Sequence, residues 1–196
     1  MKKSPDNSRQ AVLESAIKAF AKSGYAGTSV EAVLKATGLS KPTLYYYFEN
    51  KAGLYRAILA FAYDECHRLM EEGVARGGSG QQQLASLAEA LFQFTCTHED
   101  LMRLVLATIF AAPGEMPPKC IDPAKRRRNF ELIERVIKLG QKSGDLSQDY
   151  TSIELTHGLM GAISHQVRSH LLDPGRALDR KCAERTVALF LDGGRK

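Results

Sequence analysis

The chain has 196 residues, of which 44% are hydrophobic and 25% charged, and its formal net charge is +5. This composition suits one compact domain or two small ones and excludes a disordered or collagen-like protein. The longest apolar run, at about 104–112, is too short for a bilayer, which needs about 18–20 such residues. The N-terminal segment lacks the continuous apolar core of a signal peptide. We therefore expect a cytoplasmic protein without a membrane span.

The positive charge is concentrated at one end of the chain. Residues 1–60 hold nine Lys or Arg against four Asp or Glu, whereas residues 61–196 hold 18 of each. A basic module joined to a neutral one favours binding of a polyanion by the first part. An uneven split also arises by chance, so charge alone leaves both interpretations open.

Helical patterns dominate the chain, and strand patterns are nearly absent. Apolar residues at helical spacing from Val12 to Phe20 predict a first helix, which Gly24 stops. Thr28 and Glu31 fit a capping box for a short second helix that ends before a turn at 38–39.

The third and fourth helices follow directly. Ser40 is suited to cap the third, and Pro42 falls in its first turn, where the missing N–H costs little. The third helix is expected to end at about Tyr47. Asn50 then caps a longer helix that extends to about Gly73. Two helices joined by a short turn with Gly form a helix-turn-helix motif.

The sequence pattern also predicts helices in the rest of the chain. A flexible connector is expected at 73–83, and a loop at 113–123, where four prolines occur in eleven residues. The predicted helices beyond the connector lie at about 84–94, 101–112, 122–142, 151–172 and 178–191. The expected fold class is all-α, with about nine helices.

Residues 28–59 carry the most information on function. A recognition helix needs short polar or basic residues at its N-terminus and buried residues that hold it on its scaffold. Leu44 and Phe48 lie four apart and share the buried face. Tyr45, Tyr46 and Tyr47 cover the other directions, where hydroxyls can donate to phosphates and rings can contact sugars or thymine methyl groups.

The motifs of this region resemble those of the tetracycline-repressor (TetR) family of bacterial transcription regulators. The similarity extends from about residue 9 to residue 59 and includes the patterns A..AF...GY.GTSVE and TGLSKPTLYYYFENKAGL. It implies a helix-turn-helix DNA-binding domain at 6–66, with the motif at about 29–48, and a C-terminal helical domain at 80–196. The implied DNA-binding residues are Thr28, Ser29, Ser40, Lys41, Pro42, Thr43, Tyr45, Tyr46, Tyr47 and Lys51.

The residues themselves support these assignments unequally. Lys51, beside the N-terminus of a helix, suits a phosphate, and the alternative is a solvated lysine. Thr43 either reads a base edge or only satisfies backbone groups in the first turn. One of the three tyrosines is expected to pack partly inward. Tyr47 stands at a position where many family members carry His, a departure that is common in the family and leaves its implied role unchanged.

The resemblance further implies a homodimer, which pairs the helices at about 151–172 and 178–191, and a pocket for a small-molecule inducer of unknown identity. Leu159, Ile163, Val167 and Leu171 form an apolar stripe. Val187, Phe190 and Leu191 give the last helix an apolar side that serves either a core or this interface. Aromatic, Met and Cys residues at helical spacing line the pocket or belong to the ordinary core. The candidates are Phe61, Phe92, Cys96, Met102, Phe110, Phe130 and Met160.

We accordingly expect a homodimeric repressor that binds a palindromic double-stranded DNA operator. Binding of a small-molecule ligand is expected to release the repressor from this operator. The alternative is a regulator of the same fold that responds to a protein partner or to thiol oxidation. No grouping of residues suggests an enzyme, a cofactor or a metal site: His157, His165 and His170 do not place a metal-binding pair on one face of a helix. The basic run at 125–128 is interpreted as a solvated helix face.

Overall fold

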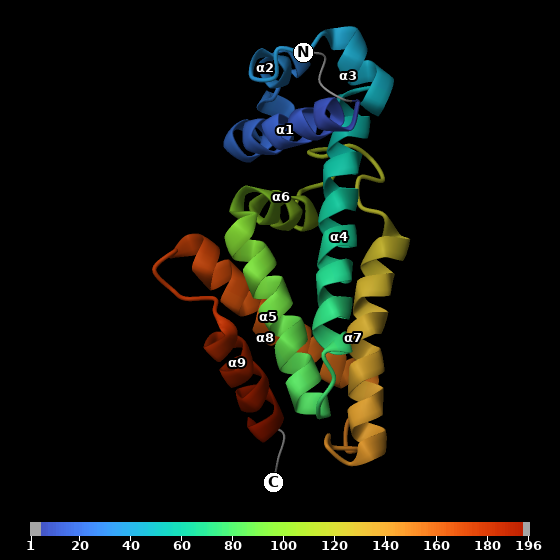
Figure 1. The fold of residues 1–196 in the computed structure, drawn as a ribbon, viewed down its shortest axis with the longest axis vertical. Helices are drawn as coiled ribbons and strands as arrows, with labels where there is room; N and C mark the ends of the chain where they lie inside the picture. Colours follow the sequence, from blue (N-terminus) through green and yellow to red (C-terminus); the bar gives the residue numbers. More distant parts are fainter. Residues whose placement is uncertain (1–4, 194–196) are drawn as a thin grey trace. The chain divides into compact units, whose positions relative to one another are not determined.

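The computed structural model describes residues 5–193, and all of the regular secondary structure in that range is helical. The expected all-α fold is thereby confirmed for these residues. None of their helices combines the length and the apolarity that crossing a bilayer requires. Figure 1 shows the helices in chain order, with the bounds α1 Pro5–Gly27, α2 Val30–Lys35, α3 Lys41–Phe48, α4 Lys51–Ala75, α5 Gly80–Thr97, α6 Glu99–Ile109, α7 Pro123–Ser143, α8 Ser152–Leu172 and α9 Arg180–Gly193.

The chain forms two compact units. Of the described residues, the first unit contains 5–62 together with Asp100–Pro123, and the second contains Tyr63–Glu99 and 124–193. Helix α4 contributes residues to both. The first unit therefore holds α1 to α3, the first half of α4, and α6, although α6 is distant from the others in sequence.

The core of the first unit forms where α1, α2 and α3 pack against one another. Phe20 of α1 and Tyr55 of α4 are both buried, and their rings meet edge to face with centroids 5.0 Å apart. The backbone of α1 breaks at Gly24, whose φ of 68° lies in the left-handed region that favours glycine. The stop predicted at this residue is confirmed.

Helix α2 is capped by Ser29 rather than by Thr28. The Ser29 hydroxyl accepts a hydrogen bond of 3.1 Å from the amide of Ala32, whereas the Thr28 hydroxyl donates to the carbonyls of Ala19 and Gly24. The capping box predicted from Thr28 and Glu31 is wrong, because the buried Thr28 side chain turns toward α1. Loss of an N-cap hydroxyl typically costs about 1 kcal/mol.

The connector in the second unit is shorter than expected. Helix α4 continues to Ala75, and α5 already begins at Gly80. Ser79 and Gln82 form a capping box, in which each side chain accepts from the backbone amide of the other residue. The glutamine run predicted as connector is therefore helical, because its second residue completes the cap.

The apolar stripe of α8 belongs to the core of this chain. Leu159, Ile163, Val167 and Leu171 are between 0% and 6% exposed in a single copy. Helix α9 packs along α5 and α8 in the same unit. The stripe serves the core rather than an interface, so contacts with a second copy would have to use other faces of α8 and α9.

Candidate nucleic-acid interface

Helix α3 presents its N-terminus through a local capping arrangement. The Ser40 hydroxyl accepts a hydrogen bond of 3.4 Å from the amide of Thr43 and lies 2.8 Å from the Thr43 hydroxyl. Pro42 stands in the first turn, as predicted, where its ring fits the helical φ. Ser40 and Pro42 are exposed and Thr43 is half-buried. The Thr43 hydroxyl is thus hydrogen-bonded to the hydroxyl of Ser40, the N-cap residue of α3.

Two buried residues hold α3 on the scaffold. Leu44 is fully buried and Phe48 is 4% exposed, as their spacing predicts. Full burial of such a side chain contributes about 1.5–3 kcal/mol. The guanidinium of Arg9 on α1 lies 5.3 Å from the centre of the Phe48 ring. The sequence analysis did not single out Arg9, because a contact over 39 positions leaves no periodic signal.

The opposite side of α3 carries exposed tyrosines. Tyr46 is 83% exposed and Tyr45 is 37% exposed. Tyr47 is half-buried, with its ring centroid 5.2 Å from that of Tyr46 and 6.1 Å from that of Phe48. Tyr47 is thus the tyrosine that packs partly inward. The other two offer rings and hydroxyls to a partner of the helix.

Lys41 at the start of α3 pairs with Glu31 of α2. The Lys41 Nζ atom is 2.7 Å from Glu31 Oε1 and 5.9 Å from the centre of the Tyr45 ring. The hydrogen bond and the attraction between the charges lower the pKa of Glu31 and raise that of Lys41. Both side chains are at least half exposed. Glu31 therefore competes with any anion that approaches Lys41, a role that the sequence did not reveal.

Lys51 is held inside the first unit. Its ammonium donates a hydrogen bond of 2.8 Å to the carbonyl oxygen of Thr28 and lies 4.4 Å from the centre of the Tyr25 ring. The alternative of a solvated lysine is therefore wrong. The side chain is half-buried, and it ties the start of α4 to the segment between α1 and α2.

Thr28 does not belong to the exposed surface. Its side chain is 3% exposed, and its hydroxyl donates to Gly24 O at 2.7 Å and Ala19 O at 3.0 Å. The Thr28 hydroxyl already satisfies two carbonyls next to the break in α1, and the implied place of Thr28 near a DNA phosphate stays a prediction. Ser29, the next residue, is exposed.

A tight turn joins α3 to α4. Glu49 has a φ of 59°, and the Asn50 side chain accepts a hydrogen bond of 2.8 Å from the amide of Gly53. A Cβ atom at position 53 would lie 2.1 Å from the carbonyl oxygen of Phe48. Only glycine allows this close approach of the two backbones. The turn thereby fixes the end of α3 against the start of α4.

The residues predicted to line a pocket are divided between the two units. Phe61, Met102 and Phe110 lie in the first, and Phe110 is 69% exposed, which is unsuited to an enclosed wall. The other four lie in the second unit: Phe92 is fully buried, Cys96 is exposed, and Phe130 and Met160 are half-buried. The hollows described within the units, at α1–α2, at α5–α9 and beside Leu146, have other linings.

The surroundings of the cysteines favour protonated thiols at two positions. Burial raises the pKa of Cys66 to about 12. Cys96 Sγ lies 3.9 Å from His170 Nε2, and partial burial together with the Glu99 charge raises the pKa of this thiol as well. Within residues 5–193, no group of three or more His, Cys, Asp or Glu side chains is placed to hold a metal ion.

Residues 12–58 match the family described as bacterial regulatory proteins, tetR family. This part of the chain is a TetR-family DNA-binding region. The match covers α1 from its second turn, the capped helices α2 and α3, the Gly53 turn and the start of α4. It coincides with the surface built by Ser40, Lys41 and the tyrosines.

Curated relatives are named as HTH-type transcriptional regulators. The HTH-type transcriptional repressor ComR of Escherichia coli (strain K12) is 49% identical over 51 residues, which are 26% of this chain and 24% of ComR. The HTH-type transcriptional regulator YuxN of Bacillus subtilis (strain 168) is 26% identical over 141 residues, 72% of this chain. That match spans 47% of YuxN, so the chain covers about half the length of this relative.

A solved structure shares the fold along almost the whole chain. The transcriptional regulator FadR from Bacillus subtilis, in complex with stearoyl-CoA, aligns with a TM-score of 0.75 and 16% identity. The alignment covers 95% of this chain and 99% of FadR. At this level of identity the likeness shows the fold alone.

Proposed function

We propose that the protein is a homodimeric transcriptional repressor that binds a palindromic DNA operator and that a small-molecule inducer releases. The observation that carries the proposal is the exposed side of α3, where Tyr45 and Tyr46 face outward while Leu44 and Phe48 anchor the helix. A helix presented in this way fits the major groove, in which side chains distinguish base pairs. The name of ComR, a repressor, supports the direction of regulation.

Each exposed group has a role in this proposal. The tyrosines contact bases and sugars, and Ser29, Ser40 and Lys41 approach phosphates next to helix N-termini, where backbone amides favour an anion. Pro42 and Thr43 lie nearest to the base edges. The Lys51 ammonium donates one hydrogen bond to the Thr28 carbonyl oxygen, and its other N–H groups contact a phosphate.

The proposed dimer uses faces of α8 and α9 that a single copy leaves exposed. Gly161, His165, Arg168 and Leu172 follow at helical spacing, and all four are exposed, Leu172 by 86%. On α9, Leu189 is 74% exposed. A short recognition helix cannot supply enough base contacts alone, so a palindromic site requires two copies.

The proposed inducer acts on the helices beyond α3. FadR, which shares the fold, is in complex with stearoyl-CoA, and this supports a small-molecule ligand for the present chain. Among the predicted lining residues, Phe92, Phe130 and Met160 belong to one unit. Control by oxidation of Cys66 or Cys96 is less well supported, because burial raises the pKa of both thiols and disfavours the reactive thiolate. No step of this function requires catalysis.

The proposal is tested by mobility shift with the DNA that flanks the protein's own gene, at two salt concentrations and with competitor DNA. We expect Tyr46→Ala to weaken specific binding by about 1–3 kcal/mol, as loss of a base contact does. Tyr150→Ala is the matched control, since Tyr150 is 48% exposed but lies between α7 and α8. Equal binding of flanking and competitor DNA, or equal losses in both variants, would contradict the proposal.

A further inference from the structure

A polar groove of about 800 Å³ lies in the second unit, between the end of α4, the start of α5 and α9. Its lining consists of arginine, glutamate, glutamine, serine and glycine, and the only apolar side chains in it are two alanines, Ala85 and Ala188. Such a lining offers little surface to an apolar ligand. It offers many hydrogen-bond donors to a polar one.

Three guanidinium groups and two carboxylates set the charge of the groove. Arg76 pairs with Glu89 at 3.5 Å, and Arg180 pairs with Glu184 at 2.8 Å. Within the described part of the chain, Arg185 has neither an ion pair nor a hydrogen bond. One guanidinium is therefore unused, and the other two are held in place by carboxylates that an anion could replace.

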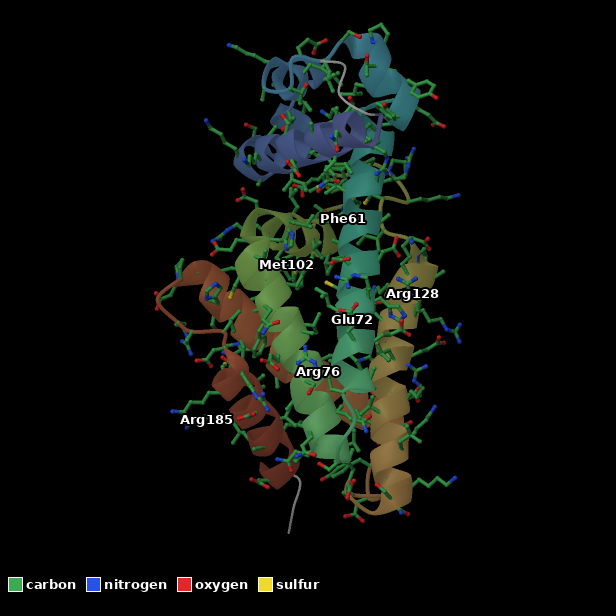
Figure 2. The ribbon with its side chains drawn as sticks, viewed as in Figure 1. Phe61, Glu72, Arg76, Met102, Arg128 and Arg185 are labelled. Carbon is green, nitrogen blue, oxygen red and sulfur yellow. The ribbon has the colours of Figure 1, made fainter. Side chains whose placement is uncertain are left out.

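The cations stand on different elements. Arg76 follows the last residue of α4, whereas Arg185 projects from α9, as Figure 2 shows. Glu89 of α5 belongs to the same lining and adds to the attraction that raises the pKa of Arg180, behind the nearer Glu184. A ligand with a single anionic group would engage one wall, whereas a ligand with two can engage both.

The groove and the exposed apolar residue Leu189 occupy adjoining parts of the α9 surface. A helix turns by about 100° per residue, so Arg180, Glu184 and Ala188 share one flank. Leu189 lies on the other flank, and the buried Ala183 and Val187 lie between them. Arg185, four residues before Leu189, lies between the two flanks, so pairing of α9 with a second copy through Leu189 would leave Arg76 and Arg180 open and place Arg185 at the edge of the contact.

We propose that this groove binds a small polar ligand with at least two anionic groups, of the phosphate or carboxylate class, through Arg76, Arg180 and Arg185. The proposal does not rest on the DNA-binding function. It defines a second ligand site, distinct from the inducer site proposed among Phe92, Phe130 and Met160.

The test is calorimetric titration of the full chain with pyrophosphate, citrate and inorganic phosphate at constant ionic strength. We expect saturable binding of pyrophosphate or citrate, with the tighter of the two identifying the class, and weaker binding of inorganic phosphate. Arg185→Ala should weaken the binding about tenfold or more, as loss of a charge-assisted contact does. Glu184→Gln should tighten it, because Arg180 is then free.

The matched control is Lys142→Ala, which removes an exposed cation of α7 outside the groove. It should leave the affinity unchanged. Opposite changes in Arg185→Ala and Glu184→Gln cannot result from damage to the fold. Absence of saturable binding by both polyanions, or a loss in Lys142→Ala equal to that in Arg185→Ala, would overturn the proposal. Operator binding by Arg185→Ala without ligand should equal that of the unmodified chain, so the two proposals fail independently.

Discussion

The ammonium of Lys51 donates a hydrogen bond to the carbonyl oxygen of Thr28, 23 positions earlier in the chain, at 2.8 Å. This carbonyl precedes the capping residue of α2, and Lys51 itself begins α4. The same cation faces the ring of Tyr25. One side chain thereby joins three segments that surround the recognition helix.

This contact predicts two separable effects of Lys51→Ala. Loss of the hydrogen bond and the cation–π contact should destabilise the protein by about 1–2 kcal/mol, measured by denaturant unfolding. Loss of a phosphate contact should lower the salt slope of DNA binding by about one. A destabilised variant with an unchanged slope would restrict Lys51 to its internal role.

Release of Lys41 should strengthen DNA binding. In Glu31→Gln the lysine loses its anionic partner, so we expect higher affinity for all sequences and a salt slope steeper by about one. Mobility shifts with specific and competitor DNA at several salt concentrations measure both. Glu154→Gln, at the start of α8, removes another exposed carboxylate as control. Weaker binding by Glu31→Gln would mean that the pair positions Lys41 rather than restraining it.

The Gly53 turn should not tolerate a side chain. In Gly53→Ala the new Cβ would collide with the Phe48 carbonyl, and we expect a loss of about 2 kcal/mol or more in thermal unfolding. At Gly27 a Cβ would make only ordinary contact, 3.5 Å from that of Ser23, so Gly27→Ala should have little effect. Equal stability of the two variants would show that the turn can open without cost.

Asp64 predicts a dependence of stability on pH. Burial raises the pKa of this carboxyl, but hydrogen bonds from Lys125 at 2.6 Å and Arg128 at 2.8 Å outweigh burial and lower it. A lowered pKa stabilises the fold above the unfolded-state pKa, about 4 for Asp, and that stability is lost as the pH falls through the native value.

The side chain of Asp64 is 47% exposed, so solvent screening limits the effect to about 1 kcal/mol or less. Denaturant unfolding should show Asp64→Asn less stable than the unmodified protein at pH 7, with the difference shrinking below pH 4. Asp149→Asn, at an exposed loop position, should show no difference at either pH. A difference that persists in acid would contradict the ion-pair explanation.

The proposed dimer predicts a specific sensitivity to charge. Leu189→Glu should shift the protein toward the monomer in analytical ultracentrifugation, because the carboxylate would be buried in the interface. Leu139→Glu is the control, since Leu139 is 56% exposed on α7. Dissociation of both variants, or of neither, would place the interface elsewhere.

The features that the sequence predicted are local ones. The Ser40 cap, Pro42 in the first turn, and Leu44 with Phe48 on one face all depend on neighbours within one or two helical turns. Such signals can be read from spacing alone. For the same reason the break at Gly24 could be predicted.

The features that the sequence did not predict join distant positions. The Glu31–Lys41 pair, the Lys51–Thr28 bond and the groove of Arg76, Arg180 and Arg185 all depend on tertiary packing. The stripe of α8 illustrates the same limit: spacing showed that the face from Leu159 to Leu171 is apolar, but not which partner covers it. Thr28 and Ser29 are both suitable caps, and only the path of the backbone decides between them.

Within the first unit, the hydroxyl oxygen of the buried Tyr55 on α4 lies 2.8 Å from the hydroxyl oxygen of Thr108 on α6. Thr108 donates its own hydrogen to Leu104 O at 2.7 Å, so Tyr55 is the donor in this pair. A chimaera that exchanged only the segment before α5 with that of a relative would thus separate a buried donor from its acceptor, at a cost of about 1–3 kcal/mol. The portable DNA-binding half of this protein is discontinuous, and a working exchange must carry residues 100–123 along with the N-terminal helices.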